Sequence, residues 1–553
     1  MNAAANEGNA TAAPAGAGRT VLVLGLGASG LAMARWCARR GARVRVWDSR
    51  VPADGSAADP HALPNAARLA HEAPAASLFG GELAATELDG IATVLKSPGL
   101  APGDPRIAAL LQAARAAGVP VVGELDLFVA ALAELKALHD YAPKLIGVTG
   151  TNGKTTTTAL TALLVERSGR RVVAAGNIGP TMLDTLAERL DAAGLAPDAD
   201  GACVAEPAGV ATWPEVWVLE LSSFQLDSVR AFEPDAAVVL NVTQDHLDWH
   251  GSPAAYAEAK ARVYGTQAVM VVNRDDPIVE AMAPAEPPAP PAKGRPKPPA
   301  RRVVRFGLDA PRRPGDWGLA VENGIAWLVR ALPADDAGAR SANAAAAAAP
   351  LRLQRLMPAD ALRIRGRHNA ANALAALALA TAIGCPLAPM LHGLREYRGE
   401  PHRVQWLETV EGVDVYDDSK GTNVGAAVAA IEGLGADRAP AKLVVILGGD
   451  GKGQDFAPLG PAVERHARAV ATIGRDAPAI EAALAGVPAQ GIALARQPTL
   501  EAAVAWGFAQ AQRGDALVLT PACASLDMFR DYRHRAEVYA AAVRSHALAR
   551  GSV

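Results

Sequence analysis

Short runs of apolar residues recur along the chain, and most are followed by a turn rich in Gly, Ser, Asn or Asp and then by a stretch with helical apolar spacing. Continuous apolar runs of this length indicate strands buried on both faces, as in parallel sheets covered by helices. We predict strands at 20–24, 43–47, 93–96, 120–122, 144–146, 215–219, 235–240, 302–306, 324–329, 413–416, 442–447, 469–473 and 515–519. The alternation of strands and helices predicts an α/β protein with doubly wound sheets.

The chain has 553 residues, half of them apolar, and is long enough for several cores. At about 150 residues per domain, we predict three domains, at 19–132, 133–398 and 399–553, after a disordered tail at 1–18. Two segments lack apolar periodicity, one rich in Pro, Lys and Ala at 284–300 and one rich in Ala at 333–350. We predict that both are surface inserts of the central domain.

Composition excludes several classes of function. Lys and Arg number 54 against 57 Asp and Glu, a net charge of −3, so no basic surface for nucleic acid is indicated. Cys37, Cys203, Cys385 and Cys523 are too scattered for a disulfide framework or a zinc site. No apolar run approaches the roughly 18 residues of a membrane span. We therefore expect a cytoplasmic protein, without membrane insertion, that acts on small molecules.

The stretch G-V-T-G-T-N-G-K-T-T-T-T, from Gly147 to Thr158, lies between a predicted strand and a predicted helix. A glycine-rich loop that opens a helix turns backbone N–H groups toward a phosphate chain. Lys154 would reach the outer phosphates, and Thr155 would coordinate Mg²⁺. Val148 stands where the general G-x-x-x-x-G-K-[ST] pattern has glycine, so the loop is a variant, and a turn without ligand is the alternative.

A second glycine motif, G-L-G-A-S-G at 25–30, follows the first predicted strand, and Asp48 follows the second. This arrangement is typical of dinucleotide-binding folds, in which a helix N-terminus faces a diphosphate and the acidic residue faces a ribose. The pattern indicates a phosphate but leaves the rest of the ligand open, and a fold of this type without ligand is the alternative.

Polar residues at predicted strand ends are the next candidates. Glu220 and His246 each follow a strand of the central domain, so both could converge on a Mg²⁺ that bridges bound phosphates, or each could cap the next helix. Lys260 lies in a segment with helical spacing, where a solvated cation is the simplest interpretation. Asn369 and Asn372 open a later helix, where their amides could contact a purine or cap the helix.

In the last domain, Lys420, Lys452 and Ser525 each follow a predicted strand. Side chains at this edge of a parallel sheet could form an anion-binding rim for a carboxylate substrate. Solvated loop lysines are the alternative.

Taken in chain order, these motifs resemble the Mur ligases. The resemblance rests on G-x-G-x-x-G, T-G-T-N-G-K-T, G-N-I-G at 176–179, E-L-S-S-F-Q-L from Glu220, N-V-T-x-D-H, the Lys260 segment, G-x-H-N-x-x-N, P-H-R at 401–403, D-S-K-G-T-N, G-G-D-G-K and P-A-C-A-S-L-D-x-F. These motifs span nearly the whole chain apart from the tail and the inserts, and the family carries the same variant phosphate loop. The Glu220 and Ser525 segments resemble most closely the D-glutamate-adding members.

The resemblance implies a Rossmann-like UDP-binding domain, a central P-loop ATPase-type domain with a mainly parallel sheet, and a C-terminal Rossmann-like α/β domain that binds the amino acid. It implies ATP-dependent ligation of D-glutamate to UDP-N-acetylmuramoyl-L-alanine, through an acyl phosphate and a tetrahedral intermediate, in peptidoglycan precursor synthesis. The implied cofactors are ATP, two Mg²⁺ ions and a CO₂-derived carbamate on Lys260. We expect a monomer with no nucleic-acid partner.

The resemblance also implies a role for each matching residue. The implied ATP site consists of Gly150, Thr151, Asn152, Gly153, Lys154, Thr155, Thr156, Asn369, Asn372, Arg403 and Asp418. The metal ligands would be Thr155, Glu220, His246 and carbamylated Lys260, and the catalytic residues Lys154, Asp245, His246 and Lys260. The UDP substrate would contact Ala28, Ser29, Asp48, Ser49, Arg50, Asn177, Ser222 and Gln225. D-Glutamate would contact Lys420, Thr422, Lys452, Ser525, Leu526 and Tyr532.

One segment departs from the family pattern. The sequence Arg535-Ala536-Glu537-Val538 stands where the family has an R-G-x-x-F-like segment, which leaves the role of that turn open.

Three other functions are weighed against this one. A related ligase, such as folylpolyglutamate synthetase or a Mur ligase for another amino acid, would share the central loop, although the N-terminal domain argues against the folate enzyme. A nicotinamide oxidoreductase could be built on the motif at 25–30. A nucleotide-dependent binding or switch protein could use the phosphate loop alone.

Overall fold

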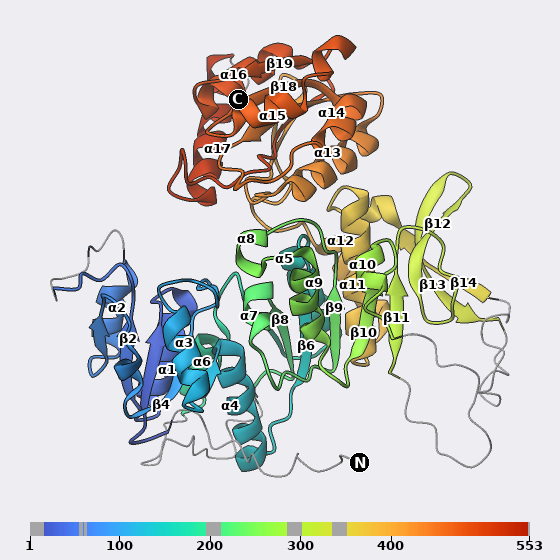
Figure 1. Ribbon diagram of the computed structural model, residues 1–553. Coiled ribbons are helices and arrows are strands. Elements are labelled where there is room, and N and C mark those ends of the chain that lie inside the picture. The colour runs from blue at the N-terminus through green and yellow to red at the C-terminus, as the bar shows by residue number, and fades with distance from the viewer. Residues whose placement is uncertain are drawn as a thin grey trace.

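The computed structural model describes residues 16–54, 59, 63–194, 212–284, 301–334 and 351–550. Most of the predicted tail at 1–18 and nearly all of the predicted inserts at 284–300 and 333–350 lie outside these ranges. Within the described residues, three sheets covered by helices form three lobes (Figure 1). The predicted α/β fold is therefore confirmed.

The N-terminal lobe holds a parallel sheet with described strands in the order β3-β2-β1-β4-β5. Its elements are β1 Thr20–Leu24, α1 Ala28–Arg39, β2 Arg43–Trp47, α2 Asn65–Glu72, β3 Ser77–Phe79, η1 Ala85–Leu88, β4 Ile91–Lys96, α3 Ala108–Ala116, β5 Val121–Val122 and α4 Glu124–His139. The sequence prediction missed β3, which is three residues long and carries no extended apolar run. Helix α4 runs through the domain boundary predicted near residue 132.

The central lobe is built on a sheet with described strands in the order β14-β13-β12-β11-β10-β9-β6-β8-β7. Its strands are β6 Lys144–Thr149, β7 Val172–Gly176, β8 Val216–Glu220, β9 Ala236–Val239, β10 Val269–Asn273, β11 Val303–Phe306, β12 Trp317–Glu322, β13 Ile325–Pro333 and β14 Leu351–Pro358. Its helices are α5 Lys154–Arg167, α6 Met182–Ala192, α7 Ser223–Asp227, α8 Leu247–His250, α9 Pro253–Ala261, η3 Arg262–Tyr264, α10 Pro277–Glu280, η5 Ala359–Ala361, α11 Arg367–Ala382 and α12 Leu387–Glu396. The pairs from β7 to β12 are parallel, whereas β12, β13 and β14 pair antiparallel.

The prediction missed β7, β10, β12 and β14 of this sheet. Strand β10 is as apolar as its predicted neighbours, so its sequence did contain the apolar run that predicts a buried strand. Strand β14 mixes apolar residues with arginine and glutamine and pairs only with β13 at the sheet edge, so it has no long apolar run. Because Pro333 pairs with Leu351, the Ala-rich segment predicted as an insert joins two directly paired strand ends.

The C-terminal lobe holds described strands in the order β15-β16-β20-β17-β18-β19, parallel except for the edge strand β15. Its elements are β15 Gln405–Val410, β16 Val413–Asp417, α13 Val424–Arg438, β17 Leu443–Gly448, α14 Leu459–His466, β18 Ala467–Ile473, α15 Ala477–Ala483, η6 Val487–Gln490, β19 Ala493–Arg496, α16 Leu500–Gln510, β20 Ala516–Leu519 and α17 Tyr532–Ala549. The two edge strands, β15 and β19, were not predicted, because each is only partly buried.

The apolar cores join two of the lobes and leave the third with cores of its own. One core extends from β1 and α1 through α4 to β8 and α9, so the N-terminal and central lobes share it. A second core lies under α5, α11 and α12 on the other face of the central sheet. The two main cores of the C-terminal lobe contain only that lobe's own described residues. The C-terminal lobe, orange to red in Figure 1, therefore shares no apolar core with the central lobe among the described residues.

None of the described helices is both long and apolar enough to cross a membrane.

Tyr141 links α4 to the central sheet in the shared core. Its hydroxyl accepts a hydrogen bond from Trp217 Nε1 at 2.9 Å and donates one to the Pro214 carbonyl at 2.7 Å. The Trp217 side chain is fully buried and packs edge-on against Phe128, with ring centroids 4.9 Å apart. The hydroxyl thus satisfies two groups that water cannot reach.

Replacing Tyr141 with Phe should therefore lower the free energy of unfolding by about 1–3 kcal/mol, because a buried indole N–H and a carbonyl both lose their partner. The measurement is the thermal midpoint, which should fall by several degrees. Tyr397→Phe is the matched control, since that hydroxyl donates to the Glu400 carboxylate within its own loop. An equal loss in both variants would contradict the proposed importance of the Trp217 contact.

Candidate functional site

The variant phosphate loop joins β6 to α5. Gly153 is the N-cap of α5 and has a φ of 83°, a left-handed conformation that favours glycine. A Cβ at this position would lie 2.6 Å from Asn372 Oδ1, so glycine also lets α11 approach the loop. The N–H groups of Thr151 and Asn152 donate to the Asn241 carbonyl at 3.0 Å and to Asn241 Oδ1 at 2.8 Å. A phosphate at the start of α5 stays a prediction.

Two lysines, Lys154 half-buried and Lys260 buried, converge on one carbonyl oxygen of this loop. Lys154 Nζ donates to the Gly150 and Thr151 carbonyls, both at 2.9 Å, and Lys260 Nζ donates to the same Gly150 oxygen at 2.9 Å. Lys260 is 1 % exposed and its amine lies 4.4 Å from the Tyr256 ring centroid, so it is not a solvated cation. Burial lowers the pKa of Lys154 and lowers that of Lys260 well below its usual range, with the Lys154 charge adding to the effect on Lys260.

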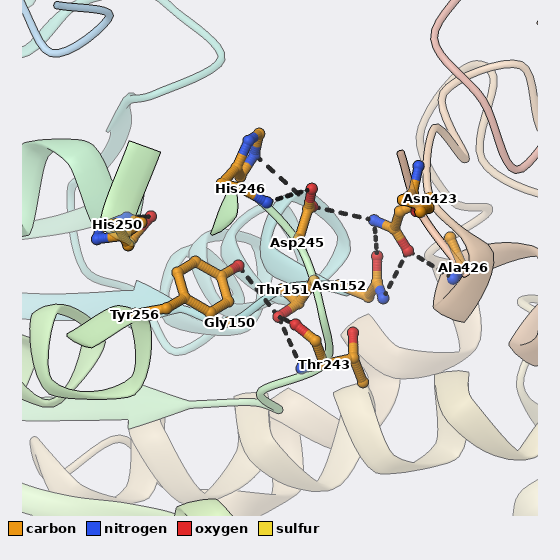
Figure 2. Close-up of polar contacts among 12 residues, drawn as sticks. Gly150, Thr151, Asn152, Thr243, Asp245, His246, His250, Tyr256, Asn423 and Ala426 are labelled. Atoms are coloured by element: carbon orange, nitrogen blue, oxygen red, sulfur yellow. Dashed lines mark hydrogen bonds and ion pairs between the residues drawn. The ribbon is translucent and has the colours of Figure 1, made fainter. Parts of the chain in front are cut away.

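Asp245 and His246 lie beside the loop on the segment before α8 (Figure 2). His246 Nε2 is 3.6 Å from Asp245 Oδ2, and its ring packs against Phe224 with centroids 4.7 Å apart. Desolvation lowers the pKa of the imidazole, and the Asp245 charge opposes this shift. The structure thus brings both residues to the same sheet edge as Lys154 and Lys260.

Glu220 and Thr155 complete this edge. Glu220 is 3 % exposed, accepts a hydrogen bond from Asn177 Nδ2 at 3.2 Å, and forms no ion pair within the described part of the chain. Ser222, and not Glu220, is the N-cap of α7. Thr155 Oγ1 accepts a hydrogen bond at 2.6 Å from Arg403, which comes from the start of the C-terminal lobe.

No group of three or more His, Cys, Asp or Glu side chains suited to a metal occurs among the described residues. Magnesium is commonly held by one or two carboxylates, waters and substrate phosphates, without a full cage of protein ligands. A buried carboxylate with no cationic partner, next to a threonine of a phosphate loop, fits that mode of binding.

A cavity of about 300 Å³ lies next to the loop, between the central and C-terminal lobes. Its lining includes Asn152, Gly153, Thr156, Asn369, Asn372, Arg403 and Asp418, all residues of the predicted ATP site. The two α11 amides are hydrogen-bonded, Asn372 Nδ2 to Asn369 Oδ1 at 3.1 Å, and neither caps the helix, whose N-cap is Gly366. Burial raises the pKa of Asp418 to about 7.

The residues predicted for the UDP substrate fall into two groups. Asp48 accepts hydrogen bonds from the Leu26 N–H at 2.7 Å and from Arg50, so it closes the glycine motif in which Ala28 and Ser29 begin α1. Ser49 accepts one from Arg106 at 2.9 Å. On the central lobe, Asn177 lies beside Glu220.

Ser222 and Gln225 bond to each other as a capping box of α7. Their contact with a substrate therefore stays a prediction.

The residues predicted for D-glutamate lie on loops at the strand ends of the third sheet. The Lys420 amine is 5.3 Å from the Tyr532 ring centroid, and burial lowers its pKa to about 8. Asp450 pairs with Ala524, which places the Lys452 loop beside Ser525. Ser525 is buried, whereas Leu526 is 70 % exposed. Thr422 and Lys452 are also exposed.

Arg535, in the segment that departs from the family pattern, is fully buried. Its guanidinium donates to Ser419 Oγ at 3.0 Å, to the Ser419 carbonyl at 2.7 Å and to the Cys523 carbonyl at 3.1 Å. It therefore ties the loop of Lys420 to the loop of Ser525. The role of this arginine is structural, and sequence alone gave no sign of it.

The sequence analysis also missed three residues that the structure brings to the loop. Tyr256 OH lies 3.1 Å from Thr151 Oγ1, and the Thr243 N–H donates to that same oxygen at 3.0 Å (Figure 2). Asn423 reaches the loop from the C-terminal lobe. Asn423 precedes an apolar helix, so the only signal in its sequence context was that of an N-cap.

Comparison with known proteins gives three family matches along the chain. Residues 19–123 match the Mur ligase MurD-like N-terminal domain, 148–290 the Mur ligase middle domain, and 402–523 the Mur ligase glutamate ligase domain. The chain is 55% identical over 534 residues to the UDP-N-acetylmuramoylalanine--D-glutamate ligase of Albidiferax ferrireducens, covering 96% of this chain and 97% of that protein. It is 55% identical over 539 residues to the ligase of the same name from Burkholderia mallei, covering 96% and 98%.

Solved structures share the fold. UDP-N-acetylmuramate-alanine ligase MurC from Thermotoga maritima aligns with a TM-score of 0.52 at 18% identity, covering 96% of this chain and 99% of that one. MurF ligase from Thermotoga maritima, in complex with ADP, aligns with a TM-score of 0.51 at 16% identity, covering 95% and 98%.

The buried amine of Lys260 generates a prediction about pH. The unfolded chain holds a proton on this amine up to a pH of about 10.4, whereas the folded chain loses it well below that pH. Between these two values the unfolded state binds more protons, so rising pH stabilises the fold. Lys260→Met removes this dependence of the free energy of unfolding on pH, and it also removes the cost of burying a cation.

We expect Lys260→Met to raise the free energy of unfolding by about 1 kcal/mol or more near pH 7. The gain over wild type should shrink as pH rises toward about 9.5, and denaturant midpoints across this range would measure it. Lys144→Met is the control, because the Lys144 amine is half-exposed and paired with Asp235 at 2.8 Å. A Lys260→Met gain that is absent or independent of pH would exclude a buried neutral amine.

Proposed function

The chain belongs to the Mur ligase family, and from this premise we propose that it joins D-glutamate to UDP-N-acetylmuramoyl-L-alanine at the expense of ATP. The product would be a precursor of peptidoglycan. The observation that carries the reaction class is the convergence of Lys154 and Lys260 on the phosphate loop, beside a cavity that residues of two lobes line. Near full-length identity of 55% to ligases of this name supports the choice of D-glutamate.

The chemistry needs two anions to approach each other. A carboxylate oxygen of the UDP substrate would attack the γ-phosphorus of ATP, and ADP would leave, which gives an acyl phosphate. The amine of D-glutamate would then attack the acyl carbon, and the tetrahedral intermediate would expel phosphate. Lys154, now bonded to loop carbonyls, would turn to the phosphates and offset the repulsion in the first step.

Thr155, Glu220 and His246 would hold Mg²⁺, together with Lys260 if it carries a carbamate. A neutral Lys260 amine can add to the carbon of CO₂ and release a proton, which converts the side chain into a carboxylate-like ligand. The lowered pKa of Lys260 supports this addition. When bound, the metal ions neutralise charge on the phosphates. His246 and Asp245 are the candidates to accept the proton of the incoming amine, and the lowered pKa of His246 favours its neutral form.

The three lobes would each bind one substrate. Ala28, Ser29, Asp48, Ser49, Arg50 and Asn177 would hold the UDP substrate, with Ser222 and Gln225 nearby. Asn369, Asn372, Arg403 and Asp418 would hold the adenosine of ATP. Lys420, Thr422, Lys452, Ser525, Leu526 and Tyr532 would hold D-glutamate.

A single chain supplies all these residues, so we propose a monomer. Its nucleotide substrates support a place in the cytoplasm.

Purified protein supplied with ATP, Mg²⁺, UDP-N-acetylmuramoyl-L-alanine and D-glutamate should release phosphate and form the extended UDP-peptide in equal amounts. Omitting either D-glutamate or the UDP substrate should abolish phosphate release. The measurement is phosphate release together with mass analysis of the product. Equal turnover with L-glutamate, L-lysine or L-alanine would assign the chain to another specificity, and hydride transfer to NAD without ATP would support an oxidoreductase.

Variants of Lys154 and Lys260 test the division of roles. Lys154→Ala should stop phosphate transfer, and Lys260→Ala should lower kcat by about a hundredfold or more, while both retain affinity for the UDP substrate. Steady-state kinetics and calorimetric binding measure these effects. Lys144→Ala, at a lysine of the same strand-loop unit whose amine pairs with Asp235 on the surface, is the control and should keep wild-type turnover. Unchanged turnover in Lys260→Ala would refute the metal-holding role.

A further inference from the structure

The first turn of α13 docks on the phosphate loop through a reciprocal pair of amides. Asn423 Nδ2 donates to Asn152 Oδ1 at 3.0 Å, and Asn152 Nδ2 donates to Asn423 Oδ1 at 3.3 Å. The two residues are 271 positions apart and belong to different lobes. Figure 2 shows the two side chains facing each other.

The Asn423 amide uses its full hydrogen-bonding capacity. Its oxygen also accepts from the Ala426 N–H at 2.8 Å, which caps α13, and its nitrogen reaches Asp245 Oδ2 at 3.5 Å. The side chain is only 6 % exposed. One residue of the C-terminal lobe therefore contacts its own helix, the phosphate loop and the segment that carries His246.

The close approach of α13 also depends on the absence of a side chain at Gly425. A Cβ there would lie 3.1 Å from Thr243 Oγ1 and 3.2 Å from Asn152 Nδ2. Thr243 is itself bonded to the loop, because Thr151 Oγ1 accepts from its N–H at 3.0 Å and donates to its carbonyl at 3.2 Å. The loop, the Thr243 to His246 segment and the start of α13 thus form one hydrogen-bonded unit.

We propose that Asn423 is a positioning residue for phosphate transfer. Docked Asn423 orients Asn152 and the Asp245 carboxylate, so the phosphate loop reaches its working geometry only when the lobe that carries the D-glutamate loops is in place. The C-terminal lobe shares no apolar core with the central lobe among the described residues. The Asn423 contact is one of the polar contacts between them, with those of Arg403 to Thr155 and of the Gly366 N–H to Asp437. The inference rests on the proposed ligase function and adds a coupling between lobe docking and phosphate transfer.

The helix cap and the inter-lobe contact can be separated by substitution. Asn423→Ser retains a cap oxygen for Ala426 but is too short to bond both atoms of Asn152. Asn423→Asp retains the cap and loses the donor, and it places a second carboxylate beside Asp245. We expect both variants to lower kcat by about tenfold to a hundredfold, with the KM for the UDP substrate and the thermal midpoint close to wild type.

Thr499→Ala is the matched control for capping. Thr499 caps α16 of the same lobe by accepting from the Ala502 N–H at 3.2 Å, far along the chain from the loop. This variant should lose thermal stability and keep its kcat. Gly425→Ala should lower kcat as Asn423→Ser does, although it removes no polar group. The double variant Asn152→Ala/Asn423→Ala should lose as much kcat as the more impaired of its two single variants, because the second substitution removes a contact that the first has already broken.

Small-angle X-ray scattering of the substrate-free protein gives a readout that needs no turnover. The radius of gyration of Asn423→Ser should exceed that of wild type, while Thr499→Ala should match wild type. An unchanged radius together with wild-type kcat in Asn423→Ser, or additive losses in the double variant, would overturn the inference. If the wild-type protein forms no D-glutamate product, the proposed function is contradicted. The scattering comparison then still decides whether Asn423 docks the lobe.

Discussion

The structure is organised by an electrostatic constraint at the phosphate loop, where two lysine amines bond to one carbonyl oxygen in a buried setting. Burial disfavours a charged amine and lowers the pKa of both lysines, and the Lys154 charge lowers the pKa of Lys260 further. The charges of Glu220 and Asp245 oppose the lowering of the Lys154 pKa, and that of Asp245 opposes the lowering of the Lys260 pKa.

Two kinds of interface hold the lobes around this loop. The N-terminal and central lobes share an apolar core, so separating them would expose buried side chains to water. The C-terminal lobe contributes Arg403 and Asn423, whose hydrogen bonds water can replace at small net cost. The third lobe also docks through Asp437, which accepts a hydrogen bond from the Gly366 N–H at 3.0 Å, whereas Arg403 and Asn423 both reach the phosphate loop.

Much of the fold could be predicted, because buried parallel strands are apolar along their whole length. The prediction failed mainly where this rule does not apply: β14 and β15 lie at sheet edges and mix apolar with polar or charged residues. Candidate site residues followed from their place at strand ends. The sequence left open whether Lys260 is solvated and whether Asn369 and Asn372 cap their helix. In the structure Lys260 is buried, and the two asparagines line a cavity instead of capping α11.

By itself, the sequence determined most of the strands and which loops carry glycine and lysine, and it predicted a phosphate site at the edge of a parallel sheet. Local spacing encodes these features. Only the tertiary structure decided that Lys260 meets Lys154 on the Gly150 carbonyl, that Arg535 joins two loops of the third sheet, and that Asn423 bonds to Asn152 across 271 positions. Such contacts depend on the order of strands and the docking of lobes, and the periodicity of a segment records only whether its side chains are buried, never against which distant residue.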